Sequence, residues 1–237
     1  MSRPLFVFRP EPGLRVTLET AAASGLQAIG CPLFEVEPVA WSPPDSQDFD
    51  ALLVGSSNVF RHGGRGLDRL AGLPVYAVGE ATADSAREKG FRVARTGRGG
   101  LQAILDDLGP RDMTFLRLAG EAMVELVAPP GITIVTRIVY RMRPLPIEET
   151  IAKRLSRGGV ALLHSGVAAT RLLEECKRIS VDRSGVTIAA LGPRIADLAG
   201  DGWQAVHTAS QPVDAQLLAL AKALCNDGDT KARRTDS

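Results

Sequence analysis

Arginine, small residues and hydroxyl residues recur at points where apolar runs end and helical patterns begin. They are Arg9, Ser56, Asn58, Gly79, Thr82, Gly120, Ser165 and Gly192. In an open parallel sheet such points share the carboxyl edge, where helix N-termini leave backbone N–H groups free. Hydroxyl and free N–H groups together bind oxyanions, so the pattern predicts a ligand with carboxylates or phosphates. Each residue taken alone is more typical of a helix cap or a turn, and it is their recurrence in both halves of the chain that favours a ligand.

Tyr140 is a candidate proton donor. It ends a β-rich run, 132–143, and has Arg137, Arg141 and Arg143 as sequence neighbours. Nearby cations favour the phenolate and make a phenol a better acid. A tyrosine that packs a linker against a domain is the alternative.

Several other chemistries find no support in the sequence. Glycine-rich stretches at 63–66 and 97–100 lack nucleotide-binding spacing, and neither Ser56 nor Ser165 lies in G-x-S-x-G. We interpret His62 and His164 as structural. The cysteines, Cys31, Cys176 and Cys225, are odd in number, far apart and without a CxxC pair. We therefore expect no metal, no disulfide and no cofactor, and a reducing cytoplasm is the simplest compartment.

Length and composition fit a globular protein. The 237 residues suggest one large or two small domains, and 45% hydrophobic with 23% charged residues is close to average usage. A formal net charge of +1 gives no general attraction to nucleic acid or anionic membrane. No apolar segment approaches the roughly 18 residues of a membrane span, and no signal peptide is expected.

Apolar runs alternate with helical patterns along the chain, and the order of parts repeats. The stretch 51–108 reads as a strand ending in serine, a helix, a strand ending in Gly-x-x-x-Ala, a helix, a short strand and a helix. The stretch 161–224 reads the same way, as a degenerate duplication. Strands alternating with helices predict parallel sheets covered on both faces. The fold class is therefore α/β, with two doubly wound parallel-sheet lobes.

The proline-interrupted stretch 29–40 and the β-rich run 132–143 predict a two-stranded β linker between the lobes. Lobe 1 would be discontinuous, comprising 1–34 and 147–225. The linker would be 35–46 and 132–146, and lobe 2 would be 47–131. The tail, 226–237, has little apolar content and is predicted to be disordered.

These parts together resemble the uroporphyrinogen-III synthase family over the whole chain except the tail. The matching elements are Phe8-Arg9-Pro10, Ser56-Ser57-Asn58, 76–83 with Gly90-Phe91, 116–121, Val139-Tyr140-Arg141, Leu163-His164-Ser165 and 188–193. Each is weak alone, but their order and spacing are fairly specific.

The resemblance implies two α/β lobes joined by a β ladder, and a lyase of porphyrin and haem biosynthesis. Its reaction cyclises hydroxymethylbilane to uroporphyrinogen III with inversion of ring D and loss of water, without a cofactor. It aligns the family's tyrosine with Tyr140 and gives carboxylate binding to Arg9, Ser56, Asn58, Thr82 and Ser165, with backbone N–H groups near Gly79, Gly120 and Gly192. Arg117 and Arg141 could add charge or form surface ion pairs. We expect a cytoplasmic monomer.

The chain departs from the family pattern at two places. Ile195 stands where the family's second Gly-Pro-x-Thr-Ala carries threonine, and Glu121–Val124 lacks a glycine-arginine often found there. We expect activity because Tyr140, Thr82 and Ser165 are present. One alternative is a noncatalytic tetrapyrrole- or anion-binding module on the same fold. The other is a hinged solute-binding protein, which is normally exported, so the lack of an expected signal peptide counts against it.

Overall fold

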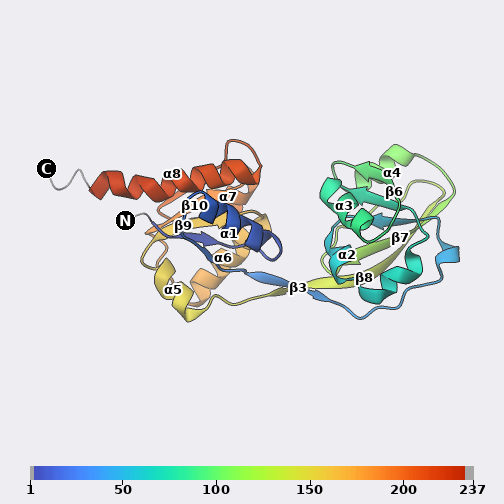
Figure 1. The fold of residues 1–237 in the computed structure, drawn as a ribbon, viewed down its shortest axis with the longest axis horizontal. Helices are drawn as coiled ribbons and strands as arrows, with labels where there is room; N and C mark the ends of the chain where they lie inside the picture. Colours follow the sequence, from blue (N-terminus) through green and yellow to red (C-terminus); the bar gives the residue numbers. More distant parts are fainter. Residues whose placement is uncertain (1–2, 233–237) are drawn as a thin grey trace. The chain divides into compact units, whose positions relative to one another are not determined.

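The computed structural model of the chain describes residues 3–232, which fall into two compact units (Figure 1). Unit 1 takes the chain up to Glu35 and from Pro144 onward, and unit 2 is Val36–Arg143. The chain passes from one unit to the other twice, so unit 1 is discontinuous in sequence and unit 2 is continuous.

Unit 1 contains a five-stranded parallel sheet. Its elements are β1 (Leu5–Val7), α1 (Gly13–Ala23), β2 (Ala28–Gly30), α5 (Glu149–Leu155), β9 (Gly159–Leu163), α6 (Gly166–Arg178), β10 (Val186–Ala190), α7 (Pro193–Ala199), β11 (Ala205–Thr208) and α8 (Asp214–Ala232). The strand order is β11-β10-β9-β1-β2, and each neighbouring pair is parallel. The direction of winding reverses between β1 and β9, the kind of switch point at which ligands bind in such sheets.

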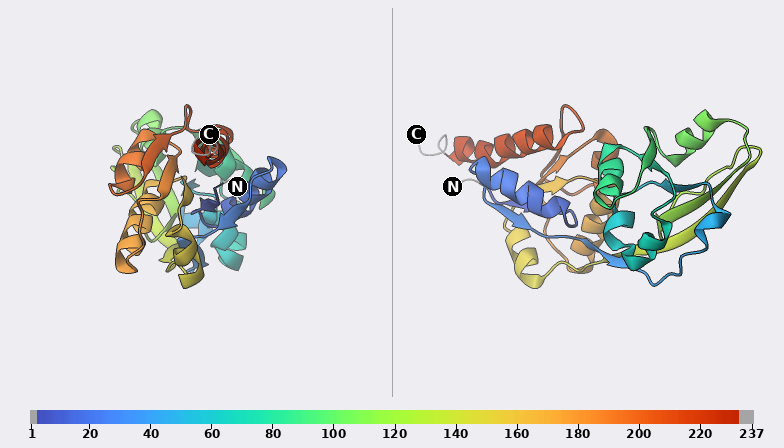
Figure 2. Two further views of the ribbon diagram at one scale, coloured as in Figure 1. Left: turned by 90° about the vertical axis from the view of Figure 1, so that its left-hand side faces the viewer. Right: turned by 45° about the vertical axis from the view of Figure 1, so that its right-hand side comes forward.

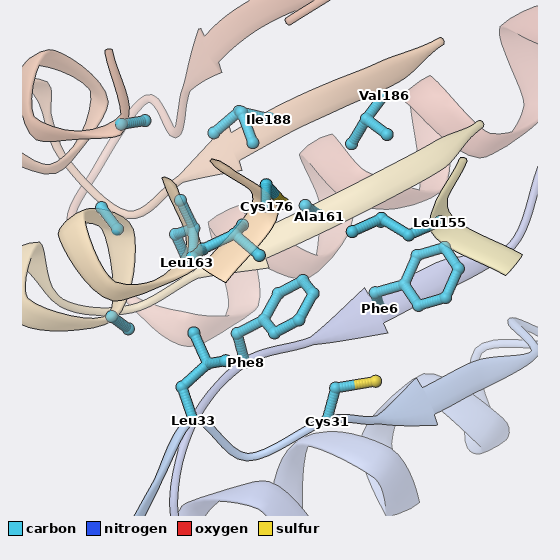
Figure 3. Packing of buried hydrophobic residues seen from close by; sticks show 14 of the residues in the cluster. Phe6, Phe8, Cys31, Leu33, Leu155, Ala161, Leu163, Cys176, Val186 and Ile188 are labelled. Carbon is cyan, nitrogen blue, oxygen red and sulfur yellow. The ribbon is translucent and has the colours of Figure 1, made fainter. Parts of the chain in front are cut away.

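Helices cover both faces of the unit 1 sheet, as the alternation of strands and helices predicts. Helices α5, α6 and α7 pack on one face, and α1 and α8 pack on the other. Figure 2 shows α1 and α8 on the same side of the sheet. Successive residues of β1 point to opposite faces, so Phe6 and Phe8 enter the first layer while Leu5 and Val7 enter the second. All four are fully buried, and Figure 3 shows both phenylalanines within the first layer.

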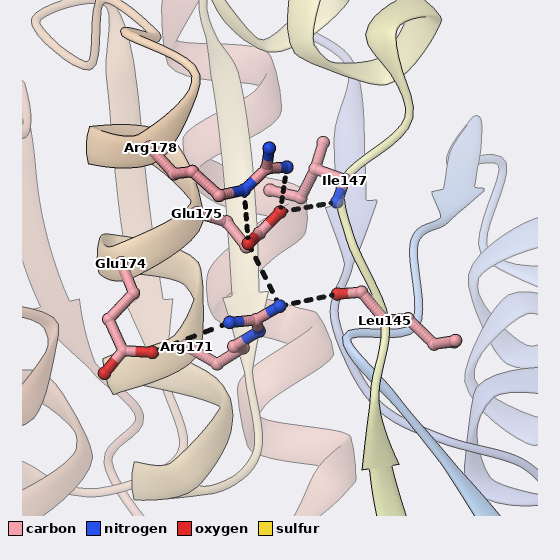
Figure 4. A network of polar contacts seen from close by, with 6 residues as sticks. All are labelled: Leu145, Ile147, Arg171, Glu174, Glu175 and Arg178. Carbon is pink, nitrogen blue, oxygen red and sulfur yellow. Dashed lines mark hydrogen bonds and ion pairs between the residues drawn. The ribbon is translucent and has the colours of Figure 1, made fainter.

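A buried carboxylate fixes the segment by which the chain re-enters unit 1. Glu175 on α6 is 1% exposed and accepts hydrogen bonds from Arg178 at 2.8 and 2.7 Å and from the Ile147 backbone N–H at 2.8 Å (Figure 4). Arg171 pairs with Glu175 at 3.0 Å and donates to the Leu145 carbonyl at 3.4 Å. The Arg178 hydrogen bonds lower the pKa of Glu175, which keeps this carboxylate ionised.

Unit 2 contains a six-stranded sheet. Its elements are β3 (Phe34–Pro38), η1 (Ser46–Asp48), β4 (Ala51–Val54), α2 (Asn58–His62), η2 (Gly64–Leu70), β5 (Val75–Val78), α3 (Glu80–Glu88), β6 (Val93–Gly97), α4 (Leu101–Leu108), β7 (Met113–Gly120) and β8 (Ile132–Pro144). The order is β3-β8-β7-β4-β5-β6, and the pairings from β8 to β6 are all parallel. Helices α2, η2 and α3 cover one face and α4 covers the other. The switch point lies between β4 and β7.

Strand β8 belongs to the unit 2 sheet along most of its length, whereas the sequence predicts 132–146 as linker. Residues from Ile132 to Tyr140 pair in parallel with β7, and β3 is the neighbour on the other side. A β-rich run does not reveal its partner, because pairing with a strand a dozen residues earlier is not visible in local composition.

The two sheets share one spatial plan. The order β6-β5-β4-β7-β8 in unit 2 corresponds to β11-β10-β9-β1-β2 in unit 1. The repeat predicted from sequence corresponds to the three strands and their helices that run outward from β4 and from β9. The remaining pair of strands follows them in unit 2 but precedes them in unit 1.

Helix α8 is longer than the sequence predicts. The predicted helix ends at Leu224 and is followed by disorder over 226–237, but α8 continues to Ala232. Adding a residue to an existing helix forms a hydrogen bond at little further cost, so weak apolar content does not end it. Residues 233–237 lie outside the described part of the chain. None of the described helices is both long and apolar enough to cross a bilayer.

Candidate functional site

A pocket of about 140 Å³ opens at the carboxyl edge of the unit 2 sheet, at the switch point between β4 and β7. Three residues predicted from sequence line it, namely Ser56, Gly120 and Tyr140. Arg117 and Met123 line it as well. Parallel strands therefore bring together a hydroxyl, a phenol and a guanidinium from segments far apart in the sequence.

A bulge in the β7–β8 pairing sets the position of Tyr140. Ala119 pairs with Ile138, but the next residue, Gly120, pairs with Tyr140. The extra residue, Val139, is fully buried in the core. Because a bulge changes the direction in which side chains point, this one places the phenol at the pocket instead of continuing the regular alternation.

The ring of Tyr140 packs against the backbone of Gly120. A Cβ at position 120 would lie 2.5 Å from ring Cε2 and 2.9 Å from Oη, so only glycine allows this approach. The Glu121 N–H also donates to the Tyr140 carbonyl at 3.0 Å. Within the described residues no group hydrogen-bonds to the phenol oxygen, which leaves Oη free for a ligand.

The arginines that flank Tyr140 in sequence have other partners. Arg141 and Arg143 pair with Glu37 of β3 at 3.0 and 2.7 Å, and Arg137 donates to the carbonyl of Thr136. Of the two roles that the sequence leaves open for Arg141, added charge or a surface ion pair, the structure shows the ion pair.

Ser56 lies in the turn from β4 into α2, and Asn58 is the first residue of α2. Ser56 Oγ accepts the Asn58 backbone N–H at 3.2 Å, and Ser56 lines the pocket. The Asn58 side chain accepts from Arg61 at 3.4 Å and is not part of the lining.

Gly79 follows the next strand, β5, and Thr82 lies in the first turn of α3. Gly79 precedes α3 with a φ of 74°, a conformation that favours glycine, and a Cβ added there would meet no atom within 4 Å. Thr82 is 5% exposed, and neither residue lines the pocket.

Of the two roles that the sequence leaves open for Arg117, added charge or a surface ion pair, the structure excludes the second within the described residues. Arg117 lies in β7, is 7% exposed, and donates from Nη2 to the Val124 carbonyl at 2.8 Å. Its Nε is buried without a hydrogen-bond partner, and no carboxylate of the described residues pairs with it. Burial lowers the pKa of its guanidinium.

Arg9 lies at the switch point of the unit 1 sheet, directly after β1. Its Nη1 contacts Asp214 of α8 at 2.8 Å and Thr17 of α1 at 3.1 Å. The guanidinium lies against Gly13, where a Cβ would be 2.5 Å from it. The guanidinium of Arg9 is thus already paired with a carboxylate of the chain itself.

His164 follows β9 beside the Arg9–Asp214 pair. Its side chain is 7% exposed, its Nε2 is 3.9 Å from Asp214, and both ring nitrogens are buried without hydrogen-bond partners. The pKa of His164 is lowered to about 4, mainly by burial and also by the charge of Arg9, while the charge of Asp214 opposes the shift. The ring is therefore neutral near pH 7.

Ser165 and Gly192 begin the next two helices of unit 1. Ser165 Oγ accepts the Ala168 N–H at 3.3 Å, an ordinary N-cap, and Gly192 precedes α7 with open space around it. Ile195 is half-buried against the unit 1 core. It also lines a cavity of about 630 Å³ between α6 and α7 whose lining contains none of the predicted site residues.

Metal ligands do not gather in the described residues, where no group of three or more His, Cys, Asp or Glu could hold an ion. The three cysteines are buried and free, and burial raises the pKa of Cys31 and Cys176 to about 12 and that of Cys225 to about 11. These thiols are poor nucleophiles.

Sequence reasoning missed Asp214. An acidic residue at the start of a predicted helix was the available signal, but its ion-pair partner is 205 residues away.

Comparisons with known proteins agree on one family. A family model described as uroporphyrinogen-III synthase HemD matches residues 16–219. The crystal structure of uroporphyrinogen-III synthetase from Helicobacter pylori 26695 is 18% identical and has a TM-score of 0.64, covering 94% of this chain and 100% of that one. A mutant uroporphyrinogen III synthase from Thermus thermophilus is 18% identical with a TM-score of 0.51, covering 93% and 98%. These structures share the fold. A search of curated proteins gave no match.

Proposed function

The chain belongs to the uroporphyrinogen-III synthase family of haem-biosynthesis enzymes, and from that premise we propose how its residues carry out the family's reaction. The substrate is hydroxymethylbilane, a linear tetrapyrrole with acetate and propionate arms. The enzyme cyclises it to uroporphyrinogen III, inverts ring D and releases water. The unit 2 pocket, where a free phenol meets a strand-end hydroxyl, is the reaction site.

Tyr140 is the proton donor. Its phenol protonates the terminal hydroxymethyl oxygen, the C–O bond breaks with its electron pair on oxygen, and water leaves an electrophilic azafulvene. The substituted carbon of ring D attacks this carbon to form a spiro intermediate, which fragments and recloses with ring D inverted. A proton lost from the substrate restores the phenol. The packing on Gly120 supports this role, because it holds Oη toward the pocket.

The other predicted residues hold the carboxylate arms and fold the substrate, so orientation is the main contribution. Ser56 and the backbone near Gly120 act inside the pocket. Outside it the candidates are Arg9, Asn58, Thr82 and Ser165, with N–H groups near Gly79 and Gly192. The capping role of Ser165, the burial of Thr82 and the ion pair of Arg9 with Asp214 make these three the weaker contributors. Ile195 supplies no hydroxyl contact.

The reaction needs no cofactor, because every step moves protons and electron pairs within the substrate and Tyr140. We place the protein in the cytoplasm as a monomer, with hydroxymethylbilane as its partner and neither nucleic acid nor membrane.

The main support for this function is that Oη of Tyr140 lies at the pocket without a hydrogen-bond partner among the described residues. Tyr140→Phe tests the proposed role of this hydroxyl. Hydroxymethylbilane is generated in situ, the products are oxidised, and uroporphyrin isomers I and III are separated. We expect wild-type protein to yield isomer III and Tyr140→Phe to lower turnover by about a hundredfold. Tyr76→Phe, at the only other tyrosine, is the matched control. Unchanged turnover would remove Tyr140 from the mechanism.

The wild-type result separates the enzyme from the alternative binding module. Isomer I alone from folded protein, together with protection against heat by an added tetrapyrrole, would favour the noncatalytic module.

A further inference from the structure

Arg117 is a buried cation without a counter-ion. The arginines of unit 2 that contact carboxylates lie nearer the surface: Arg95 pairs with Asp107, Arg87 with Asp84, and both Arg141 and Arg143 with Glu37. Arg117 is 7% exposed and pairs with no carboxylate of the described residues. An unpaired buried charge is costly, so such a group is expected where a ligand supplies the opposite charge.

The guanidinium keeps most of its donors free. Nη2 donates to the Val124 carbonyl at 2.8 Å, whereas Nε and Nη1 have no hydrogen-bond partner among the residues that the structure describes. A guanidinium carries five N–H donors in a planar fork that matches a carboxylate. Arg117 lines the pocket that also contains Tyr140, so its side chain borders the proposed reaction site.

The segment after β7, residues 121–131, packs beside Arg117 and accepts its hydrogen bond. It crosses the sheet face that α4 also covers, without forming a helix, and Gln102 of α4 exchanges two hydrogen bonds of 2.9 Å with the backbone of Val127. Met123 of this segment lines the pocket and is 45% exposed. The pocket thus offers an apolar wall beside a cation, which suits a pyrrole that carries an acidic arm.

We propose that Arg117 binds a carboxylate of one acetate or propionate arm of the substrate, next to the reacting hydroxymethyl group. This assignment rests on the proposed function of the pocket. The carboxylate supplies the missing counter-ion, and the arm fixes the attached pyrrole relative to Tyr140.

Arg117→Met tests the proposal, because methionine retains an unbranched apolar stem and removes the charge. A charge-assisted hydrogen bond contributes about 1.5–3 kcal/mol, so we expect KM to rise about tenfold to a hundredfold. Turnover at saturation should fall much less. Arg117→Lys, which keeps the charge without the fork, should give an intermediate KM. Arg95→Met is the matched control and should keep KM within twofold of wild type.

Thermal unfolding separates binding from a purely structural role. If Arg117 serves the substrate, Arg117→Met should be no less heat-stable than wild type, because the variant no longer buries an unpaired charge. An unchanged KM, or a loss confined to kcat, overturns the proposal. If Arg117→Met does not fold, the KM of Arg117→Lys decides between the same two outcomes.

Binding of uroporphyrin III, followed by its fluorescence, keeps this test separate from that of the proposed function. Absence of isomer III from wild-type protein would overturn the proposed function. The dissociation constant for uroporphyrin III would still decide on Arg117, with a rise of about tenfold in Arg117→Met supporting carboxylate binding and equal constants refuting it.

Discussion

His164 should make the stability of unit 1 depend on pH between 7 and 5. Its ring is buried, neither nitrogen has a hydrogen-bond partner, and its pKa is lowered to about 4 by burial, with the charge of Arg9 adding to this and that of Asp214 opposing it. In the unfolded chain the pKa returns to its ordinary value of about 6.5. The unfolded state therefore binds more protons between these values. The contribution of neutral His164 is complete above pH 6.5 and is lost as the pH falls toward 4.

The size of the effect follows from the two pKa values. The difference between 6.5 and about 4 corresponds to about 3 kcal/mol in total, of which about 2 kcal/mol falls between pH 7 and pH 5. Glu175 does not obscure this interval, because its pKa lies below 4.5 and it titrates at lower pH. His62 has a pKa lowered by burial and by Arg61, but it is partly exposed and contributes less.

Denaturant unfolding of His164→Leu measures the effect. Leucine replaces the ring without losing a hydrogen bond, so stability at pH 7 should stay within about 1 kcal/mol of the parent protein. In a Trp41→Phe background Trp203 is the only tryptophan, and its fluorescence reports on unit 1 alone. The parent should lose about 2 kcal/mol more than His164→Leu between pH 7 and pH 5. Equal losses in the two proteins would refute the argument, and His62→Leu serves as the comparison.

Three further substitutions have defined outcomes. Gly120→Ala would place a Cβ 2.5 Å from the Tyr140 ring, so we expect turnover to fall at least about tenfold in the isomer assay, with near-wild-type circular dichroism. Glu175→Gln removes the charge of a buried carboxylate that pairs with half-buried Arg171 and exposed Arg178, and should cost about 1.5–3 kcal/mol in denaturant unfolding. In the parent protein, this carboxylate's contribution should be lost as the pH falls below 4.5. Gly79→Ala meets no atom but must adopt a φ of 74°, and should cost about 1–2 kcal/mol in unit 2 unfolding, followed by Trp41 fluorescence in a Trp203→Phe background.

The sequence predicts the parts that depend on local pattern. Apolar runs such as 51–54 and 161–163 become buried strands of the parallel sheets, because a strand covered on both faces must be apolar throughout. The hydroxyl and glycine residues after these strands lie at helix starts for the same local reason. This is why Ser56 and Gly120 could be predicted as strand-end neighbours of a ligand before any pairing was known. Tyr140 is predicted on other grounds, namely its flanking arginines and the family resemblance.

The remaining features depend on contacts between distant residues. The pairing of β8 with β7, the bulge that turns Tyr140, and the ion pair of Arg9 with Asp214 all join segments whose sequences do not signal one another. The burial of Arg117 is of the same kind. An arginine between apolar residues in a strand looks like a surface position by alternation, but α4 and the segment after β7 cover that face.

The shared plan of the two sheets explains why the proposed reaction site lies in unit 2. In unit 1 the strand equivalent to β7 is β1, and helix α1 follows it. The guanidinium of Arg9 lies against Gly13 at the start of this helix and pairs with Asp214. In unit 2 the corresponding position follows Gly120, no helix forms between β7 and β8, and the edge stays open to Tyr140 and Arg117. One sheet edge is thus closed by an ion pair within the chain, while the other retains a free phenol and a cation without a counter-ion. The carboxyl edge of the unit 2 sheet therefore suits the proposed substrate, because Arg117 can pair with one of its carboxylates and Tyr140 can donate a proton.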